Sequence, residues 1–185
     1  MTGFLKNIDK NWTLFLDRDG VINKRIYGGY VQHWEAFEFL PGVRESLAVF
    51  SRIFGRIIVI TNQQGIAKGI MNETQLEAVH CKMFAEVEKA GGKIDAVFHC
   101  PDEASKPGNC RKPSAFMALK AKKMFPEIDF SKSIMVGDAE SDMAFGKNAG
   151  MFTVLVGNET VSPEIVDFKT GDLSSLVTLL IREIL

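Results

Sequence analysis

Short apolar runs alternate with helical segments along most of this chain, and that alternation limits its fold more than any other feature. The apolar runs have the length and the continuous apolar character of strands buried on both faces. They cover residues 13–16, 57–60, 94–99, 134–136 and 152–156. Helix-sized segments cover residues 41–55, 73–90, 114–124, 141–148 and 173–185. A polar stretch at 157–172 lies between the last apolar run and the last helical segment. Because parallel strands need such crossovers, the sequence predicts an α/β fold with a doubly wound, mostly parallel sheet.

Length and composition restrict the class of protein. At 185 residues the chain is expected to form one domain, residues 1–185. Its hydrophobic content of 46% excludes intrinsic disorder, and its net charge of −1 offers no general attraction to nucleic acid, which we exclude as a partner. No apolar run approaches the ~20 residues that span a bilayer, so no membrane partner is expected. Nothing in the pattern points beyond a monomer.

The first residues and the cysteines bear on location. Residues 1–10 carry Lys6, Asp9 and Lys10 and lack the apolar stretch of a signal peptide, so the expected location is the cytoplasm. Three cysteines are an odd and small number, which argues against a disulfide framework and fits a reducing compartment. Cys81 falls inside a predicted helix and is expected to be a small core residue.

Chemically reactive residues follow four of the predicted strands, where an open parallel sheet binds its ligands. These clusters are Asp17-Arg18-Asp19-Gly20-Val21, Thr61-Asn62-Gln63, Arg111-Lys112-Pro113, and Gly137-Asp138 with Asp142. Each cluster alone is typical of a turn or a helix cap, and Lys112 alone is typical of a surface lysine. Independent accidents rarely place all four at successive strand ends, so the joint pattern favours one site.

The residue types in these clusters suit phosphoryl transfer. Asp17 and Asp138 would repel each other in one crevice unless a cation lay between them, and such oxygen ligands suit Mg²⁺. Lys112 and Thr61 would bind phosphate oxygens while Asp17 attacks phosphorus and forms an aspartyl phosphate. Asp19, two residues further on, would protonate the leaving group and later activate water.

These motifs resemble the haloacid dehalogenase-like phosphohydrolases over roughly residues 14–157, which is most of the chain. The stretches around 17–23, 30–43, 61–67 and 110–113 are similar to the branch of heptose 1,7-bisphosphate phosphatases and histidinol-phosphatases. That resemblance implies a nearly capless, Rossmann-like fold, and the short spacing from Thr61 to the 73–90 helix leaves no room for a large cap domain. Small loops must then close the site, and the segment 23–38 is the expected flap, with His33 solvated and its tyrosines and tryptophan open to a packing role as well.

The resemblance also implies a role for each matched residue. Asp17 corresponds to the nucleophile and a Mg²⁺ ligand, Asp19 to the acid/base residue with its backbone carbonyl on the metal, and Asp138 to a further metal ligand. Thr61, Asn62 and Lys112 would bind the phosphate, Asp142 would support the site, and Arg111 matches a substrate-contacting position.

Two departures from the branch are expected to matter. The branch commonly carries a zinc loop with four ligands, whereas this chain offers only Cys100 and Cys110, so we do not expect a structural zinc. His99 and Asp102 are the possible substitutes. Ala139 stands where heptose enzymes tend to place a basic residue, which weakens the assignment of a bisphosphate substrate.

The sequence therefore predicts a Mg²⁺-dependent phosphatase of a small phosphorylated metabolite in carbohydrate metabolism, with D-glycero-D-manno-heptose 1,7-bisphosphate as the first candidate. Histidinol phosphate or another sugar phosphate is the alternative, and the near-neutral charge disfavours a nucleic-acid 3′-phosphate. A receiver-like phosphoacceptor domain is the alternative from a different class. Asp19 and the Gly137-Asp138 pair argue against it.

Overall fold

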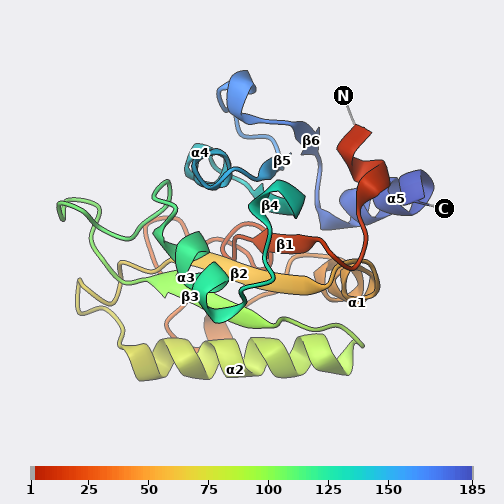
Figure 1. The fold of residues 1–185 in the computed structure, drawn as a ribbon. Coiled ribbons are helices and arrows are strands. Elements are labelled where there is room, and N and C mark those ends of the chain that lie inside the picture. The colour runs from red at the N-terminus through yellow and green to blue at the C-terminus, as the bar shows by residue number, and fades with distance from the viewer. Residues whose placement is uncertain (1–2, 185) are drawn as a thin grey trace.

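A computed structural model describes residues 3–184, and its centre is a six-stranded parallel sheet (Figure 1). The strands follow the order β3-β2-β1-β4-β5-β6, and every neighbouring pair is parallel. Their bounds are β1 Thr13–Leu16, β2 Arg56–Asn62, β3 Ala96–Cys100, β4 Ser133–Gly137, β5 Phe152–Val156 and β6 Phe168–Thr170. This is the doubly wound α/β sheet that the alternation predicts.

Five helices cover the two faces of the sheet. Their bounds are α1 Val43–Ile53, α2 Glu73–Lys89, α3 Phe116–Met124, α4 Glu140–Ala149 and α5 Leu173–Ile184, with short 3-10 helices η1 Gly3–Asn7, η2 Trp34–Ala36, η3 Phe130–Lys132 and η4 Pro163–Ile165. Leu14 and Leu16 point to the core that α1, α2 and α5 cover, while Phe15 points to the core beneath α3 and α4. All four residues of β1 are buried, which explains their uninterrupted apolar pattern. No helix within residues 3–184 combines the length and the apolarity that crossing a membrane requires.

The strand β6, Phe168–Thr170, was not predicted from the sequence. The polar stretch 157–172 contains β6, whose residues Phe168 and Thr170 pair with Val154 and Val156 of β5. β6 is a three-residue edge strand that is only half buried, and its central Lys169 is exposed. A short edge strand carrying a lysine is a common protection against edge-to-edge pairing, and it leaves almost no periodic signal.

Cys81 does not lie in the core as predicted, and the two chain ends are only partly described. Cys81 is exposed, because the buried stripe of α2 runs through Leu76, Val79, Met83 and Val87 and leaves Cys81 outside it. Leu185, the last residue of the predicted 173–185 helix, lies outside the described residues, as do the first two residues of the segment 1–10.

We expect the core beneath α1 to be sensitive to the loss of side-chain volume. Leu47 of α1 is fully buried, so Leu47→Ala should lower the free energy of unfolding by about 2–5 kcal/mol in a denaturant titration. Leu119→Ala on α3 removes the same atoms from a residue that is 59% exposed, and it should change that free energy by no more than about 0.5 kcal/mol. Equal effects of the two substitutions would contradict this packing.

Candidate active site

The carboxyl ends of the strands converge on one cavity with a volume of about 440 Å³. Asp17 and Asp19 follow β1, Thr61 and Asn62 end β2, and Lys112 lies in the loop between β3 and α3. The residues predicted for the site that line this cavity are Asp17, Asp19, Thr61, Asn62, Arg111, Lys112 and Asp142. Asp138, at the end of β4, lies beside it: carboxylate oxygens of Asp17, Asp138 and Asp142 fall within 4.8 Å of one another. The structure therefore brings all the predicted residues together.

Lys112 is the buried cation of this site. Its ammonium Nζ lies 2.7 Å from Oδ1 of Asp17 and 2.6 Å from Oδ1 of Asp142, and it donates a hydrogen bond to the Ile60 carbonyl at 3.1 Å. Only 3% of its side chain is exposed. Burial by itself lowers the pKa of Lys112, but the charges of Asp142 and Asp17 outweigh it and hold that pKa above the usual range. Lys112 therefore stays charged.

Asn62 joins the end of β2 to the loop that carries Lys112. Its side-chain Oδ1 accepts a hydrogen bond from the backbone N–H of Lys112 at 3.0 Å, and its Nδ2 donates to the Lys112 carbonyl at 3.4 Å. The amide thus fixes the loop that carries the buried lysine, and its binding to phosphate stays a prediction.

The Asp17 carboxylate is crowded by other acidic groups. Its Oδ1 accepts a hydrogen bond from the backbone N–H of Arg18 at 2.7 Å, in addition to the contact with Lys112. Burial and the nearby charge of Asp142 raise the pKa of Asp17 to about 7, although Lys112 opposes the shift. Asp17 thus lies where a divalent cation would be strongly attracted.

Asp19 is held by three side chains, Arg18, Asn23 and Gln63, for which the sequence predicted no role. Its carboxylate accepts hydrogen bonds from Arg18 at 3.0 and 3.1 Å, from Asn23 at 2.9 Å and from Gln63 at 2.8 Å. Gln63 also donates to the Thr61 hydroxyl at 2.9 Å, which links the ends of β1 and β2. Burial alone raises the pKa of Asp19, but Arg18 and these hydrogen bonds outweigh it and hold the pKa below its usual value.

Arg18 is itself fully buried and is supported by a histidine of α2. Its Nη1 lies 3.0 Å from Nε2 of His80, and burial together with the charge of Arg18 lowers the pKa of His80 to about 3. A neutral imidazole can accept the guanidinium hydrogen through Nε2, so His80 completes the support of Asp19. A charged residue between two aspartates gives no sequence signal that it will be buried.

Asp142 organises the turn at the end of β4. Its Oδ2 accepts hydrogen bonds from the backbone N–H groups of Asp138 at 3.2 Å and Ala139 at 3.1 Å, at the start of α4. Gly137 is required here because a Cβ on it would clash with Asp142. The predicted supporting role of Asp142 thus has a physical basis: one oxygen caps the helix and the other contacts Lys112.

Arg25 places a second cation among the acidic groups. Its Nη2 lies 2.6 Å from Oδ1 of Asp138, and its Nη2 and Nε donate to the Asp19 carbonyl at 3.0 and 3.2 Å. The same Nη2 of Arg25 lies 3.9 Å from Oδ2 of Asp17. Burial raises the pKa of Asp138 to about 6, and Arg25 only partly opposes this. Sequence reasoning missed Arg25 because nothing in the pattern shows that an arginine in a loop will reach a strand end.

The predicted flap, residues 23–38, has two distinct parts. Its first part lines the cavity, including Tyr30, whose ring packs over Gly65 so closely that a Cβ there would lie 3.0 Å from it. In the second part Trp34 stacks on Phe37 with ring centroids 5.0 Å apart, which is the packing role considered as an alternative. His33 is 64% exposed, as expected.

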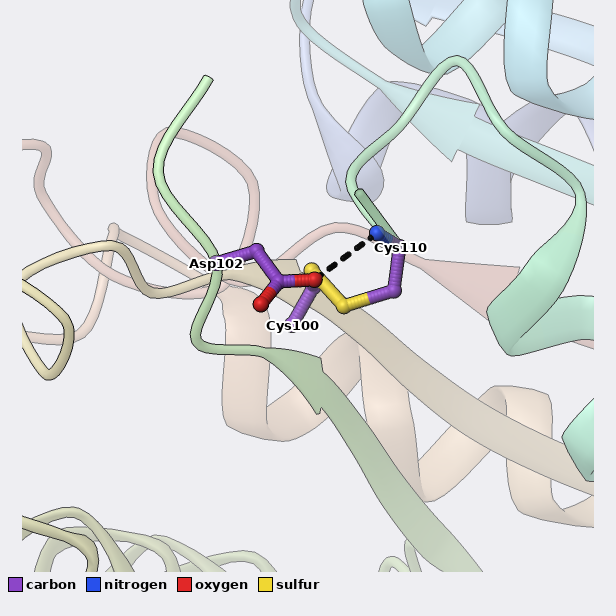
Figure 2. A group of neighbouring side chains, drawn as sticks. All are labelled: Cys100, Asp102 and Cys110. Atoms are coloured by element: carbon purple, nitrogen blue, oxygen red, sulfur yellow. Dashed lines mark hydrogen bonds between the residues drawn. A yellow bond between two sulfur atoms is a disulfide. The ribbon is translucent and has the colours of Figure 1, made fainter. Parts of the chain in front are cut away.

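The cysteines behave differently from the expectation. Cys100, the last residue of β3, and Cys110 form a disulfide with their Cα atoms 5.5 Å apart, so the argument against disulfides from the number of cysteines is wrong. Figure 2 shows Asp102 beside this bond, where its carboxylate accepts a hydrogen bond from the Cys110 backbone N–H at 3.1 Å. The disulfide closes the loop just before Arg111 and Lys112.

The donor set at the strand ends suits Mg²⁺ rather than a softer metal. Asp17, Asp138 and the backbone carbonyl of Asp19 offer oxygen atoms only, and Arg25 already contacts all three groups as a cation. Asp142 is less suited as a ligand because both of its oxygens have partners.

Comparisons with known proteins agree with this geometry. The HAD-hydrolase-like family model matches residues 109–173. The D-glycero-alpha-D-manno-heptose-1,7-bisphosphate 7-phosphatase of Campylobacter jejuni is 42% identical over 150 residues, 81% of this chain and 84% of that protein. The D-glycero-beta-D-manno-heptose-1,7-bisphosphate 7-phosphatase of Escherichia coli K12 is 33% identical over 175 residues, 90% of both chains.

Structural similarity points the same way. The crystal structure of D,D-heptose 1,7-bisphosphate phosphatase from B. bronchiseptica, complexed with magnesium and phosphate, matches with a TM-score of 0.82 at 27% identity. The match covers 93% of this chain and 99% of that chain. The chain therefore belongs to the heptose-1,7-bisphosphate phosphatase family of HAD-like hydrolases.

Proposed function

We propose that this protein is a Mg²⁺-dependent phosphatase that removes one phosphate from D-glycero-D-manno-heptose 1,7-bisphosphate through an aspartyl-phosphate intermediate. The observation that carries the proposal is the buried contact of Lys112 with Asp17 and Asp142, beside the carboxylate of Asp138. The names of the relatives support the choice of substrate.

Asp17 acts as the nucleophile in this mechanism. Its carboxylate attacks phosphorus, the bond from phosphorus to the substrate oxygen breaks, and the phosphoryl group is transferred to Asp17. Thr61 donates to the phosphate oxygens, and the charge of Lys112 beside Asp17 offsets the negative charge of the phosphate. Bound Mg²⁺, held by Asp17, Asp138 and the Asp19 carbonyl, would neutralise phosphate charge.

Asp19 serves both halves of the reaction as acid and then base. Its protonated form gives a proton to the leaving alkoxide, and its ionised form then takes a proton from the water that hydrolyses the aspartyl phosphate. Because Arg18, Asn23 and Gln63 favour the ionised form, the resting site is prepared for the second half. The first half needs the minor protonated form.

Substrate recognition is assigned to the loops around the cavity. Arg111 and Lys68 line it and add positive charge, which suits a substrate with a second phosphate. This charge offsets the neutral Ala139 at the position where a basic residue was expected. Histidinol phosphate or another sugar phosphate remains the second candidate, because Ala139 supplies no positive charge for a second phosphate. The receiver-domain alternative is wrong, since the chain belongs to a phosphatase family.

Four further expectations remain proposals. We propose that residues 1–185 act as one domain. We also propose that loop 100–110 holds no structural zinc, because Cys100 and Cys110 are joined in a disulfide. Metal analysis of the purified protein tests the absence of zinc. We also propose that the protein is a monomer, and light scattering tests it. A cytoplasmic location fits a charged substrate that does not cross a bilayer unaided, and cell fractionation tests it.

A comparison of substrates tests the proposed function. We expect kcat/KM for one anomer of the heptose bisphosphate to exceed that for histidinol phosphate and simple sugar phosphates by about tenfold or more. Arg111→Ala should raise KM for the bisphosphate more than KM for a monophosphate, because only the former presents a second phosphate. Preference of the wild-type protein for histidinol phosphate would favour the alternative substrate.

Replacement of the acid/base carboxylate should separate binding from turnover. Asp19→Asn keeps the backbone carbonyl and the side-chain shape, so Mg²⁺ binding should persist while steady-state phosphate release falls by about 10²–10⁴-fold. Asp9→Asn is the matched control, because Asp9 is an exposed carboxylate whose side chain contacts Asn11. Normal turnover by Asp19→Asn would contradict the assigned role.

Mg²⁺ binding should strengthen as pH rises. The pKa values of Asp17, about 7, and Asp138, about 6, are both raised, so protons compete with the metal below neutral pH. Calorimetric titration from about pH 5.5 to pH 8 should show tighter binding and fewer released protons at the higher pH.

The raised pKa values of Asp17 and Asp138 also determine how the stability of the metal-free protein changes with pH. Unfolded carboxyl groups titrate near pH 4, so between about pH 4 and pH 7 the folded protein binds more protons than the unfolded chain. These groups therefore make the metal-free protein less stable as pH rises through that window.

An affinity for Mg²⁺ that does not change with pH would contradict the assignment of Asp17 and Asp138 as ligands.

A further inference from the structure

The guanidinium of Arg25 lies where the acidic groups of the site converge. It makes an ion pair of 2.6 Å with Oδ1 of Asp138, donates two hydrogen bonds to the Asp19 carbonyl, and lies 3.9 Å from Oδ2 of Asp17. These are the three groups that the proposed function assigns to Mg²⁺. Arg25 is therefore a cation of the protein itself at the proposed metal position.

The two cations exclude each other. Mg²⁺ approaches its oxygen ligands to about 2.0–2.1 Å and requires near-octahedral geometry, so it needs the lone pairs that the guanidinium now engages. Arg25 cannot keep its contact with Oδ1 of Asp138 and both bonds to the Asp19 carbonyl while the metal is bound.

Of the two site cations beside Asp17, Arg25 is the one that can leave. Lys112 is 3% exposed and has three partners around its ammonium group. Arg25 is 31% exposed, comes from the flap rather than from the sheet, and also lines the open cavity. The backbone next to it is anchored by a hydrogen bond from the Lys24 N–H to the Glu38 carbonyl, so the side chain can withdraw while the base of the flap stays in place.

We propose that Arg25 is a positioning residue that occupies the metal position in the metal-free protein and must withdraw when Mg²⁺ binds. In the metal-free protein it balances the charge of Asp17 and Asp138, which would otherwise face each other with Lys112 as the nearest cation. Its withdrawal couples metal binding to the conformation of residues 23–38. This inference rests on the metal site of the proposed function.

Binding of Mg²⁺ to an arginine variant tests the proposal directly. In Arg25→Ala the metal no longer competes with the guanidinium, so calorimetric titration should give a dissociation constant about tenfold lower than that of the wild-type protein. Arg25→Gln, which keeps polar atoms but no charge, should also bind Mg²⁺ more tightly. Lys24→Ala is the matched control, because it removes a neighbouring positive charge that pairs only with Glu38, and it should leave the affinity near that of the wild type.

Thermal unfolding separates this role from a merely structural one. Without Mg²⁺ the melting temperature of Arg25→Ala should be lower than that of the wild-type protein, because the acidic groups lose a counter-charge. At saturating Mg²⁺ the two melting temperatures should coincide, because the metal replaces the guanidinium in both proteins. A residue that only supported the flap would lower both values equally.

The outcomes are distinct. Unchanged or weaker Mg²⁺ binding in both Arg25→Ala and Arg25→Gln, with the wild-type protein binding the metal, overturns the role of Arg25 and leaves the proposed function intact. An equal loss of melting temperature with and without metal also overturns that role. A wild-type protein that binds no Mg²⁺ overturns the proposed metal site, and this inference with it.

Discussion

The buried contact of Lys112 with two carboxylates is the interaction on which the rest of the site depends. Acidic side chains converge at the ends of β1 and β4, and burying such charges without a partner is strongly unfavourable. Lys112 offsets that cost for Asp17 and Asp142, and Asn62 fixes the backbone that carries it. Because the ammonium is fully engaged, it cannot move to balance Asp138. That carboxylate needs a separate cation, which is Arg25 in this structure and Mg²⁺ in the proposed active form.

The sheet and the acidic residues could be predicted because they follow simple rules of burial and topology. β1 and β5 have the predicted bounds, since each is a buried apolar run that ends at a polar residue or a glycine. The strand ends then converge by topology alone, so Asp17, Lys112 and Asp138 could be assigned to one site from their order in the chain. β6 could not be predicted, because it is short, half buried and interrupted by Lys169.

The residues that were missed depend on contacts between distant segments. Arg18 resembles a solvated charge in the sequence, and it is buried only because Asp19 and a neutral His80 both contact its guanidinium. Gln63 looked like part of a turn, yet it joins Asp19 to Thr61. The Cys100–Cys110 bond depends on how the loop folds back on the end of β3, which a count of cysteines does not reveal.

Reaction chemistry and substrate choice therefore have different structural origins in this protein. Asp17 and Asp138 directly follow β1 and β4, so the sheet fixes the positions of two acidic groups that the proposed reaction uses. The flap and the loop after the disulfide, which line the rest of the cavity, follow paths that no hydrophobic pattern dictates. Arg25 belongs to both parts, because its backbone lies in the flap and its guanidinium reaches the acidic groups. The proposed role of Arg25 therefore links metal affinity to the flap, even where Asp17 and Asp138 are retained.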